Sequence, residues 1–268
     1  VPFWTRHAVD REHGGFTTFL DRRGDLLSPD KPMWVQARFT WMLARLCNTL
    51  ERREEWLALA RHGIDFIEHH GFDSDGRMFF AVTRDGRPLR KRRYLFAEIF
   101  AILAFAEYAR ASGDAGALAT ARRILALVQR ILAAPTGSPG SLEPKVNPGT
   151  RPLRGHSMSM ILVNALQVLR AADTSPDPLP YDALIDAQIG EVFRFFVKPE
   201  LSALLETVGP GGEYLSELPE GRCINPGHAL ETAWFVLQEA QRRKDTALVE
   251  RALPIIDWSL ARGWDPRH

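Results

Sequence analysis

The sequence is poor in several features that would define its chemistry directly. It has only two cysteines in 268 residues, Cys47 and Cys223, which lie far apart and form no CxxC pair. We therefore expect neither a disulfide framework nor a cysteine-rich zinc site. We expect a reducing, cytoplasmic compartment instead. No apolar run approaches the ~18 residues of a membrane-spanning helix, and the opening VPFWTRHAVD lacks the apolar core of a signal peptide.

Charge of one sign is not in excess either. The 34 basic and 33 acidic residues leave a net charge of +1, which gives no reason to expect a nucleic-acid or membrane partner. The sequence also lacks a GxSxG elbow, a GxGxxG turn after a strand, a Walker loop and an HExxH motif. What remains is a chain of ordinary globular composition, 45% hydrophobic and 25% charged, long enough to bury a substantial core.

Helical periodicity is present almost throughout. Apolar residues recur at helical spacing in eight stretches, which short polar turns join into consecutive pairs. The predicted helices span residues 34–50, 54–70, 93–111, 115–133, 156–172, 181–196, 228–244 and 246–262. The first residues resemble the tail of an earlier helix, and the last six resemble the opening of another inter-pair turn. We therefore expect the chain to be incomplete at both ends.

The connections between the pairs repeat. Each has a short β-prone run and a turn with aspartate and glycine, and Gly24 and Gly86 of the first two turns lie 62 residues apart. Asp85 and Gly86 predict a β-hairpin. A repeat of this length indicates stacked helical hairpins, either in an open solenoid or in a closed double ring. Because no capping repeat with a polar outer face is visible, we favour a truncated ring that forms a single domain over residues 1–268.

The most informative stretch is RCINPGHALETAW at residues 222–234. A Pro-Gly pair precedes a helix whose first turn has His228 and Glu231 at i and i+3, on one face. A helix N-terminus tends to lower the pKa of a histidine and to attract negative charge. A neutral imidazole beside a carboxylate in this position can take a proton from carbon.

Polar residues stand at the first turns of the other odd-numbered helices as well, and we expect all these turns to open onto one central cleft. Each residue also has a structural interpretation. Arg38 suits an ordinary ion pair, Glu98 suits pairing in the interior or exposure at a helix edge, and His156 suits a helix cap. The candidate substrate-binding residues are Trp34, Arg38, Glu98, His156 and Glu231. The histidines in polar contexts are interpreted as surface residues; they are His7, His13, His62, His69 and His70.

Two other chemistries remain open at this point. His156, His228 and Glu231 could form a metal site with two histidines and one carboxylate, although a lone HxxE is a weak signal. Glu98 and Glu231 could act as the paired carboxylates of a glycoside hydrolase. The first alternative predicts a metal ion and the second does not; our preferred interpretation includes no metal.

The sequence around these residues resembles the N-acylglucosamine 2-epimerase (renin-binding protein) family. The matching segments are DREHGGF at 10–16, KPMWVQARFTWM at 31–42, TRDGRPLRKRRYLFAEIF at 83–100, RGHSMSMIL at 154–162, NPGHALETAWF at 225–235 and GWDPRH at 263–268. They extend over nearly the whole chain in the family's order. They favour the N-acetylglucosamine branch over the cellobiose epimerase and aldose–ketose isomerase branches.

The resemblance implies an (α/α)6 barrel, of which about eight helices are present, and epimerisation of a sugar at C2. One histidine removes the C2 proton, an enediolate forms, and a second histidine returns a proton to the other face. His228 matches the first histidine; the second lies in a Trp-Pro-His-type segment that this sequence does not contain. Arg38 matches an arginine that binds substrate oxygen, Glu231 the acidic partner of the histidine, and His156 a pocket histidine.

Trp34 and Glu98 are looser matches to the family's site. The resemblance also implies that no cofactor is required and that ATP can act as an allosteric activator. The basic loop 145–154 is a candidate nucleotide contact, although an ordinary solvated loop is the favoured interpretation, and we expect that a homodimer is possible. The predicted function is interconversion of N-acetylglucosamine and N-acetylmannosamine. The alternatives are an aldose–ketose isomerase, a cellobiose-type 2-epimerase, and a helical module that only binds a sugar or a protein.

Overall fold

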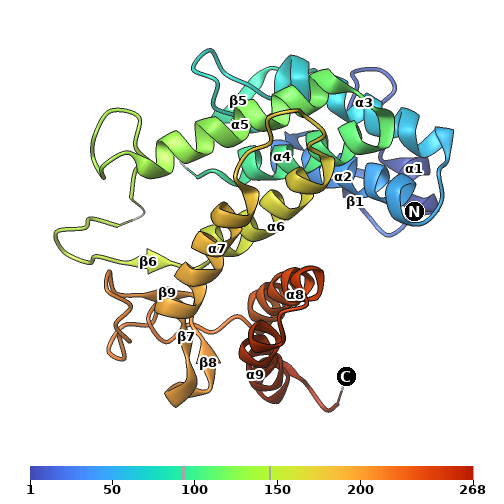
Figure 1. Cartoon of the computed structure of the whole chain (residues 1–268). Coiled ribbons are helices and arrows are strands. Elements are labelled where there is room, and N and C mark those ends of the chain that lie inside the picture. Colours follow the sequence, from blue (N-terminus) through green and yellow to red (C-terminus); the bar gives the residue numbers. More distant parts are fainter. Residues whose placement is uncertain (92–93, 145, 268) are drawn as a thin grey trace. The chain divides into compact units, whose positions relative to one another are not determined.

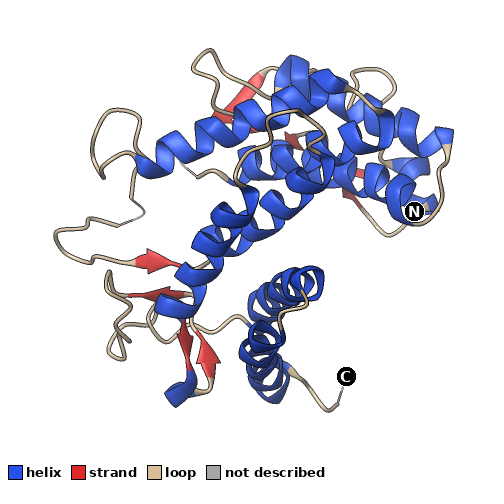
Figure 2. Ribbon diagram, viewed as in Figure 1, coloured by secondary structure: helices blue, strands red, loops and turns tan. Residues whose placement is uncertain are grey.

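The computed structural model describes residues 1–91, 94–144 and 146–267. Over these residues the chain forms nine α-helices and nine short strands (Figures 1 and 2). Two compact units can be distinguished, which we call the first unit (Val1–Glu143 with Val168–Pro176) and the second unit (Pro144–Gln167 with Asp177–His268). The expectation of a single domain over 1–268 stays a prediction.

The first unit is built from two helical hairpins that follow a short helix. Helix α2 packs against both α3 and α4, and α4 packs against α5. Gly63 of α3 allows a close helix crossing, since a Cβ there would lie 2.0 Å from the Thr40 hydroxyl of α2. The helices are α1 (Pro2–His7), α2 (Met33–Thr49), α3 (Glu54–His70), α4 (Phe96–Ser112) and α5 (Ala115–Ala133). Helix α4 is apolar on nearly every face and is buried along most of its length, so it forms the core of this unit.

The strands of the first unit lie in its connections. Strands β1 (Phe19–Leu20) and β2 (Leu26–Ser28) form one antiparallel pair. Strands β3 (Lys31–Pro32), β4 (Phe79–Val82) and β5 (Pro88–Lys91) form a sheet in the order β3-β4-β5. The predicted hairpin around Asp85 and Gly86 is thereby confirmed as the antiparallel pair of β4 and β5.

The second unit contains the start of α6 (Ser157–Ala172), α7 (Tyr181–Glu191), and the packed pair α8 (Pro226–Arg243) and α9 (Thr246–Gly263). Its short strands pair antiparallel, β6 with β9 and β7 with β8. Their bounds are β6 (Arg154–Gly155), β7 (Val197–Lys198), β8 (Ala203–Leu204) and β9 (Thr207–Val208), with a 3-10 turn at Pro199–Leu201. An apolar cluster of Val192, Phe196, Val208 and Ala233 with their neighbours forms its core.

The eight predicted helices are confirmed, and the ends of two of them, 54–70 and 115–133, agree residue for residue. The prediction of one regular helix over 181–196 was wrong at its end, because the α-helix stops at Glu191 and a π-helical turn follows at Val192–Phe196. That wider turn buries Val192 and Phe196 completely in the apolar cluster. Arg93, the predicted start of the third helix, lies outside the described residues, as do Arg92, Lys145 and His268.

The repeat seen in the sequence has a structural cause at the turn glycines. Gly24 and Gly86 have φ angles of +94° and +88°, and a Cβ on either would lie about 2 Å from a ring nitrogen, of His7 and His70 respectively. Gly212 in the second unit has φ +94°, and a Cβ there would lie 3.1 Å from the ring of Phe195, a looser contact. A histidine ring at the end of α1 and another at the end of α3 therefore cover the turns at Gly24 and Gly86, and only glycine fits beneath them.

The histidines expected at the surface are less exposed than the prediction stated. His7, His13, His62 and His70 are half-buried, and only His69 of that group is exposed. The Nε2 atom of His62 lies 2.9 Å from the carbonyl oxygen of Gly15, so this ring also fixes a connection. In these cases the polar sequence context did not reveal packing against a glycine turn.

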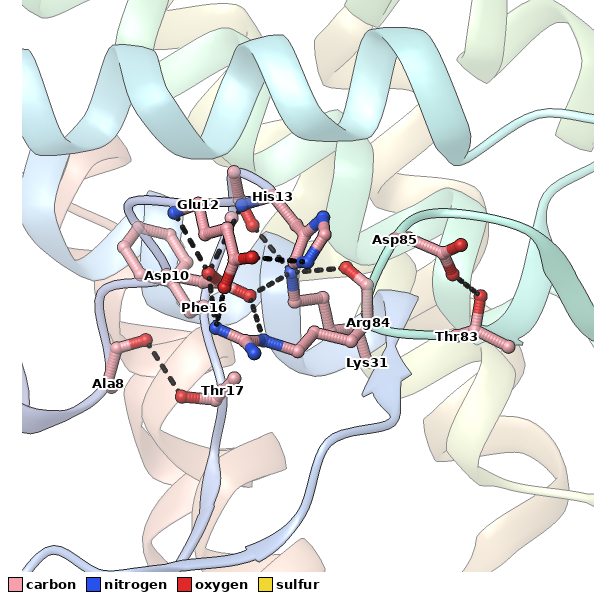
Figure 3. A network of polar contacts seen from close by, with 12 residues as sticks. Ala8, Asp10, Glu12, His13, Phe16, Thr17, Lys31, Thr83, Arg84 and Asp85 are labelled. Atoms are coloured by element: carbon pink, nitrogen blue, oxygen red, sulfur yellow. Dashed lines mark hydrogen bonds and ion pairs between the residues drawn. The ribbon is translucent and has the colours of Figure 1, made fainter.

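A buried polar network fixes the chain just before α2 (Figure 3). The Lys31 ammonium is fully buried and donates to Asp10 at 2.9 Å, to the Gly14 carbonyl at 2.6 Å and to the Arg84 carbonyl at 2.8 Å. The Arg84 guanidinium donates two further bonds to Asp10, at 2.9 and 3.0 Å. Burial alone raises the pKa of Asp10, but the bonds from Arg84, Lys31 and the backbone of His13 outweigh it and hold that pKa well below its ordinary value.

Candidate active site

The site begins at the N-terminus of α8. The Asn225 side chain accepts a hydrogen bond from the backbone N–H of His228 at 3.2 Å, and Pro226 occupies the first helical position. An asparagine cap followed by proline fixes where a helix starts. The asparagine side chain accepts a hydrogen bond from a free N–H of the first turn, and proline has no N–H there to leave unpaired. His228 therefore lies in the first turn of α8, and its side chain is 39% exposed.

The carboxylate bonded to this histidine is not the expected one. The His228 Nδ1 atom lies 2.9 Å from Oε1 of Glu206, whereas no hydrogen bond between His228 and Glu231 is found among the described residues. The expected pairing with Glu231 was therefore wrong. The half-buried Glu231 shares the helix with His228, but Glu206 approaches from the segment between β8 and β9.

Glu206 faces two histidines. Burial by itself raises its pKa, but His156 and His228 lower that pKa below the ordinary glutamate value. The side chain is 17% exposed and carries its charge at neutral pH. A fixed negative charge beside an imidazole stabilises the protonated ring, which is the state that forms when histidine takes a proton.

His156 approaches the same carboxylate oxygen. It is completely buried directly before α6, with Nδ1 3.8 Å from Glu206 Oε1 and Nε2 3.1 Å from the hydroxyl of Thr232 on α8. Its ring also packs against the edge of Phe196. The structure thus brings together His156 and His228, which the sequence separates by 72 residues. Among the described residues no group of three or more potential metal ligands is found.

Arg38 and Trp34 belong to the first unit, on α2. The exposed Arg38 guanidinium lies over two aromatic rings, 5.1 Å from the centre of Phe100 and 5.7 Å from that of Trp34. No carboxylate pairs with Arg38 in the part of the chain that the structure describes, so the ordinary ion pair is not observed there. The side chain borders a cleft of about 730 Å³, lined by residues that include Trp4, Phe19, Trp34, Trp41, Met42 and Phe80.

Glu98 is paired in the interior and is not exposed at a helix edge, which was the other structural interpretation of this residue. It is fully buried on α4, and its Oε1 accepts from Arg77 at 2.6 Å and from the backbone N–H of Met78 at 3.1 Å. Gln36 of α2, 62 positions earlier, bonds the backbone of Phe16 in the same way, at 2.8 and 2.6 Å. These contacts give Glu98 a structural role within the first unit.

The six candidate residues thus fall into two groups. Trp34, Arg38 and Glu98 lie in the first unit, whereas His156, His228 and Glu231 lie in the second. That all six border one central cleft stays a prediction. Sequence reasoning missed Glu206, whose only local signal is a carboxylate within the β-prone run LLETV.

The basic loop considered for ATP shows no free phosphate site in its described residues. Arg151 pairs with Glu220 at 3.1 Å, and Arg154 pairs with Glu191 and donates to the Pro210 carbonyl at 3.1 Å. A nucleotide there would have to displace these carboxylates. Lys145, at the start of the loop, lies outside the described residues.

Comparison with known proteins places these features in a family. The sequence model of N-acylglucosamine 2-epimerase (GlcNAc 2-epimerase) matches residues 14–268. The chain belongs to the N-acylglucosamine 2-epimerase family. It is 34% identical over 279 residues to the N-acylglucosamine 2-epimerase of Bos taurus, an alignment that covers the whole chain and 63% of that relative. The chain therefore spans somewhat less than two thirds of the length of such curated relatives.

Similarity to cellobiose 2-epimerases is lower in sequence and extends over the fold. Identity to the cellobiose 2-epimerase of Dictyoglomus turgidum is 27% over 151 residues, which covers 55% of this chain and 38% of that relative. A solved structure of cellobiose 2-epimerase from Bacillus thermoamylovorans superimposes with a TM-score of 0.81 at 17% identity, over 97% of this chain and 68% of that one. This likeness confirms the predicted all-α, (α/α)6 type of fold.

No helix within the described ranges is both long and apolar enough to cross a lipid bilayer.

Proposed function

We propose that this protein is a sugar 2-epimerase that interconverts N-acetylglucosamine and N-acetylmannosamine. Two observations support the proposal: the similarity over the whole chain to N-acylglucosamine 2-epimerases, and the partly exposed His228 bonded to the charged Glu206 at a helix N-terminus. The second observation supports this chemistry, because it supplies a base held beside a charge that stabilises its protonated form.

The reaction starts from the open-chain aldehyde. The His228 imidazole takes the proton from C2, the C–H electron pair forms a C1–C2 double bond, and the carbonyl oxygen on C1 becomes negatively charged. Return of a proton to the opposite face of C2 restores the aldehyde with inverted configuration, so the oxidation state does not change. Each general acid or base contributes ~10²–10⁴ to the rate. We assign only the first base within this chain, because His156 is completely buried.

The charge that develops on the C1 oxygen needs positive potential nearby. Arg38 is our candidate for that role, supported by a guanidinium that has no carboxylate partner among the described residues and lies over aromatic rings. The N–H groups at the start of α8 are a second source of positive potential. Trp34, Glu231 and His156 stay predicted sugar contacts, while the observed bonds of Glu98 favour a structural role.

We place the enzyme in the cytoplasm, with a small sugar as its substrate and no cofactor in the reaction. ATP as an activator and a homodimer both stay predictions, and the loop pairing of Arg151 and Arg154 argues against a preformed nucleotide contact there.

The test is NMR of N-acetylglucosamine incubated with the protein in D₂O. We expect the C2 proton signal to disappear through exchange and N-acetylmannosamine carrying deuterium at C2 to accumulate. Formation of a ketose from an unacetylated aldose in a parallel sample would show the isomerase instead, and epimerisation of cellobiose in another would show the cellobiose-type enzyme. Sugar binding without exchange at C2 in any of these sugars would refute the proposal and leave the binding module.

A further inference from the structure

Glu206 lies where three segments of the second unit meet. Its backbone N–H donates to the Cys223 carbonyl at 3.0 Å, just before α8, and its carbonyl accepts from the backbone N–H of His156 at 3.0 Å, just before α6. On either side, Leu204 pairs with Val197 and Thr207 with Gly155. The carboxylate is therefore held on a backbone that also fixes the starting points of both histidine-bearing segments.

The hydroxyl of Thr232 determines where His156 carries its proton. This hydroxyl has one hydrogen, and it donates it to the His228 carbonyl at 2.7 Å. It can therefore only accept from His156 Nε2, 3.1 Å away, so Nε2 of His156 is protonated. The Nδ1 atom of His156 has no hydrogen-bond partner and faces Glu206 Oε1 at 3.8 Å. A further proton on His156 would thus point at Glu206.

The same oxygen determines the proton position on His228. An ionised carboxylate only accepts hydrogen bonds, so the 2.9 Å contact requires a proton on Nδ1 of His228. The neutral ring then has its lone pair on Nε2. Of the two ring nitrogens, this is the one that Glu206 leaves free to react.

We propose that Glu206 is the positioning residue of this site, which holds His228 in the Nδ1–H tautomer so that Nε2 takes the substrate proton. The inference rests on the function proposed above for the role of Nε2, but the tautomer itself does not depend on any substrate. His156 lies near the same oxygen, with Nδ1 3.8 Å away, but in its neutral form that nitrogen has no proton to donate and so leaves the oxygen to His228. Glu206 acts through His228 and needs no contact with the sugar.

The direct test uses the unaltered chain with ¹⁵N-labelled histidine. Above the titration range of the ring, we expect His228 to show a protonated Nδ1 and an unprotonated Nε2, the reverse of the form that isolated histidine prefers. Its resonances are assigned by their loss in His228→Ala. A protonated Nε2 with a bare Nδ1 would overturn the inference, whether or not the protein turns over a sugar.

The variant Glu206→Gln tests the consequence for the reaction. Glutamine keeps the size of the side chain, but its amide can accept from or donate to Nδ1, so it no longer imposes one tautomer. We expect kcat for C2 exchange to fall roughly 10²-fold or more with KM changed much less, as for other catalytic histidines that lose a tautomer-fixing carboxylate. The ¹⁵N spectrum of His228 should change together with the rate, and Glu206→Asp should restore part of both.

The matched control is Glu217→Gln in the same connection. Glu217 is exposed and its carboxylate bonds only the adjacent Ser216 hydroxyl among the described residues, so rate and tautomer should equal those of the unaltered chain. If the unaltered protein shows no C2 exchange, the proposed function fails while the tautomer measurement still stands. If it does exchange, and folded Glu206→Gln keeps its rate and tautomer, only the positioning role fails. Should Glu206→Gln not fold, the spectrum of the unaltered chain decides.

Discussion

Replacing Asp10 by asparagine should destabilise the first unit strongly. Asp10 is 3% exposed and Lys31 0%, with 2.9 Å between the Lys31 nitrogen and the carboxylate. The substitution leaves the Lys31 ammonium buried with only the Gly14 and Arg84 carbonyls as certain acceptors. Breaking a buried ion pair from one side costs ~3–5 kcal/mol. Since ~1.4 kcal/mol is a factor of ten, the folded-to-unfolded ratio should fall at least about a hundredfold.

The assay is urea unfolding followed by circular dichroism at neutral pH. Asp10→Asn should lower the unfolding midpoint clearly, and the double variant Asp10→Asn/Lys31→Met should recover part of the loss, because it removes the stranded charge. Lys91→Met is the control. Lys91 pairs with Asp73 and Asp75 at the surface, where exposed ion pairs contribute little, so its midpoint should hardly move. Equal effects of Asp10→Asn and Lys91→Met would refute the reasoning.

The contribution of Asp10 should also depend on pH in one direction. Its pKa is lower in the folded chain than its ordinary value of 3.8, so its stabilising effect is complete above that value and is lost as the pH falls toward the folded pKa. The difference in stability between the unaltered chain and Asp10→Asn should therefore be largest near about pH 6 and shrink toward about pH 3. A difference that stays constant or grows on acidification would contradict the assigned sign.

Three further predictions concern single side chains. Gly86→Ala should lower the melting temperature, because the position has φ +88° and a Cβ would lie 2.1 Å from a ring nitrogen of His70. Gly113→Ala is the control: it has φ +78° but open space around it, so it should lower the free energy of unfolding only by the ~1–2 kcal/mol of backbone strain. Asn225→Ala should cost ~1 kcal/mol in urea unfolding through the lost helix cap, and should broaden the His228 resonances. Arg38→Met should lower kcat for C2 exchange by ~10²–10³ if the guanidinium stabilises the developing oxyanion, and an unchanged kcat would exclude that role.

Much of the fold could be predicted because its determinants are local. Apolar residues at helical spacing and polar turns located all eight major helices, and the Asp85–Gly86 turn located the hairpin. The repeat also contained information that we did not use. Gln36 and Glu98 lie 62 residues apart, and both bond the backbone of the preceding connection. That correspondence alone would have favoured the structural interpretation of Glu98.

The acidic partner of His228 could not be predicted in the same way. Sequence spacing offered Glu231 one helical turn away, whereas the actual partner, Glu206, is placed by pairing between two-residue strands that carry almost no periodic signal. The π-helical turn at Val192–Phe196 was missed for a related reason. It follows from packing of its aromatic residues into the apolar cluster, a demand of the tertiary structure that helical spacing does not express.

The central claim is that the imidazole of His228 removes the proton from C2. The most direct measurement is the loss of deuterium from N-acetylglucosamine labelled at C2, followed in ordinary water with the unaltered chain and with His228→Ala. The account predicts wash-out by the unaltered chain and at least ~10²-fold slower wash-out by the variant, with the same melting temperature in both. Equal wash-out rates, from two equally folded proteins, would contradict it.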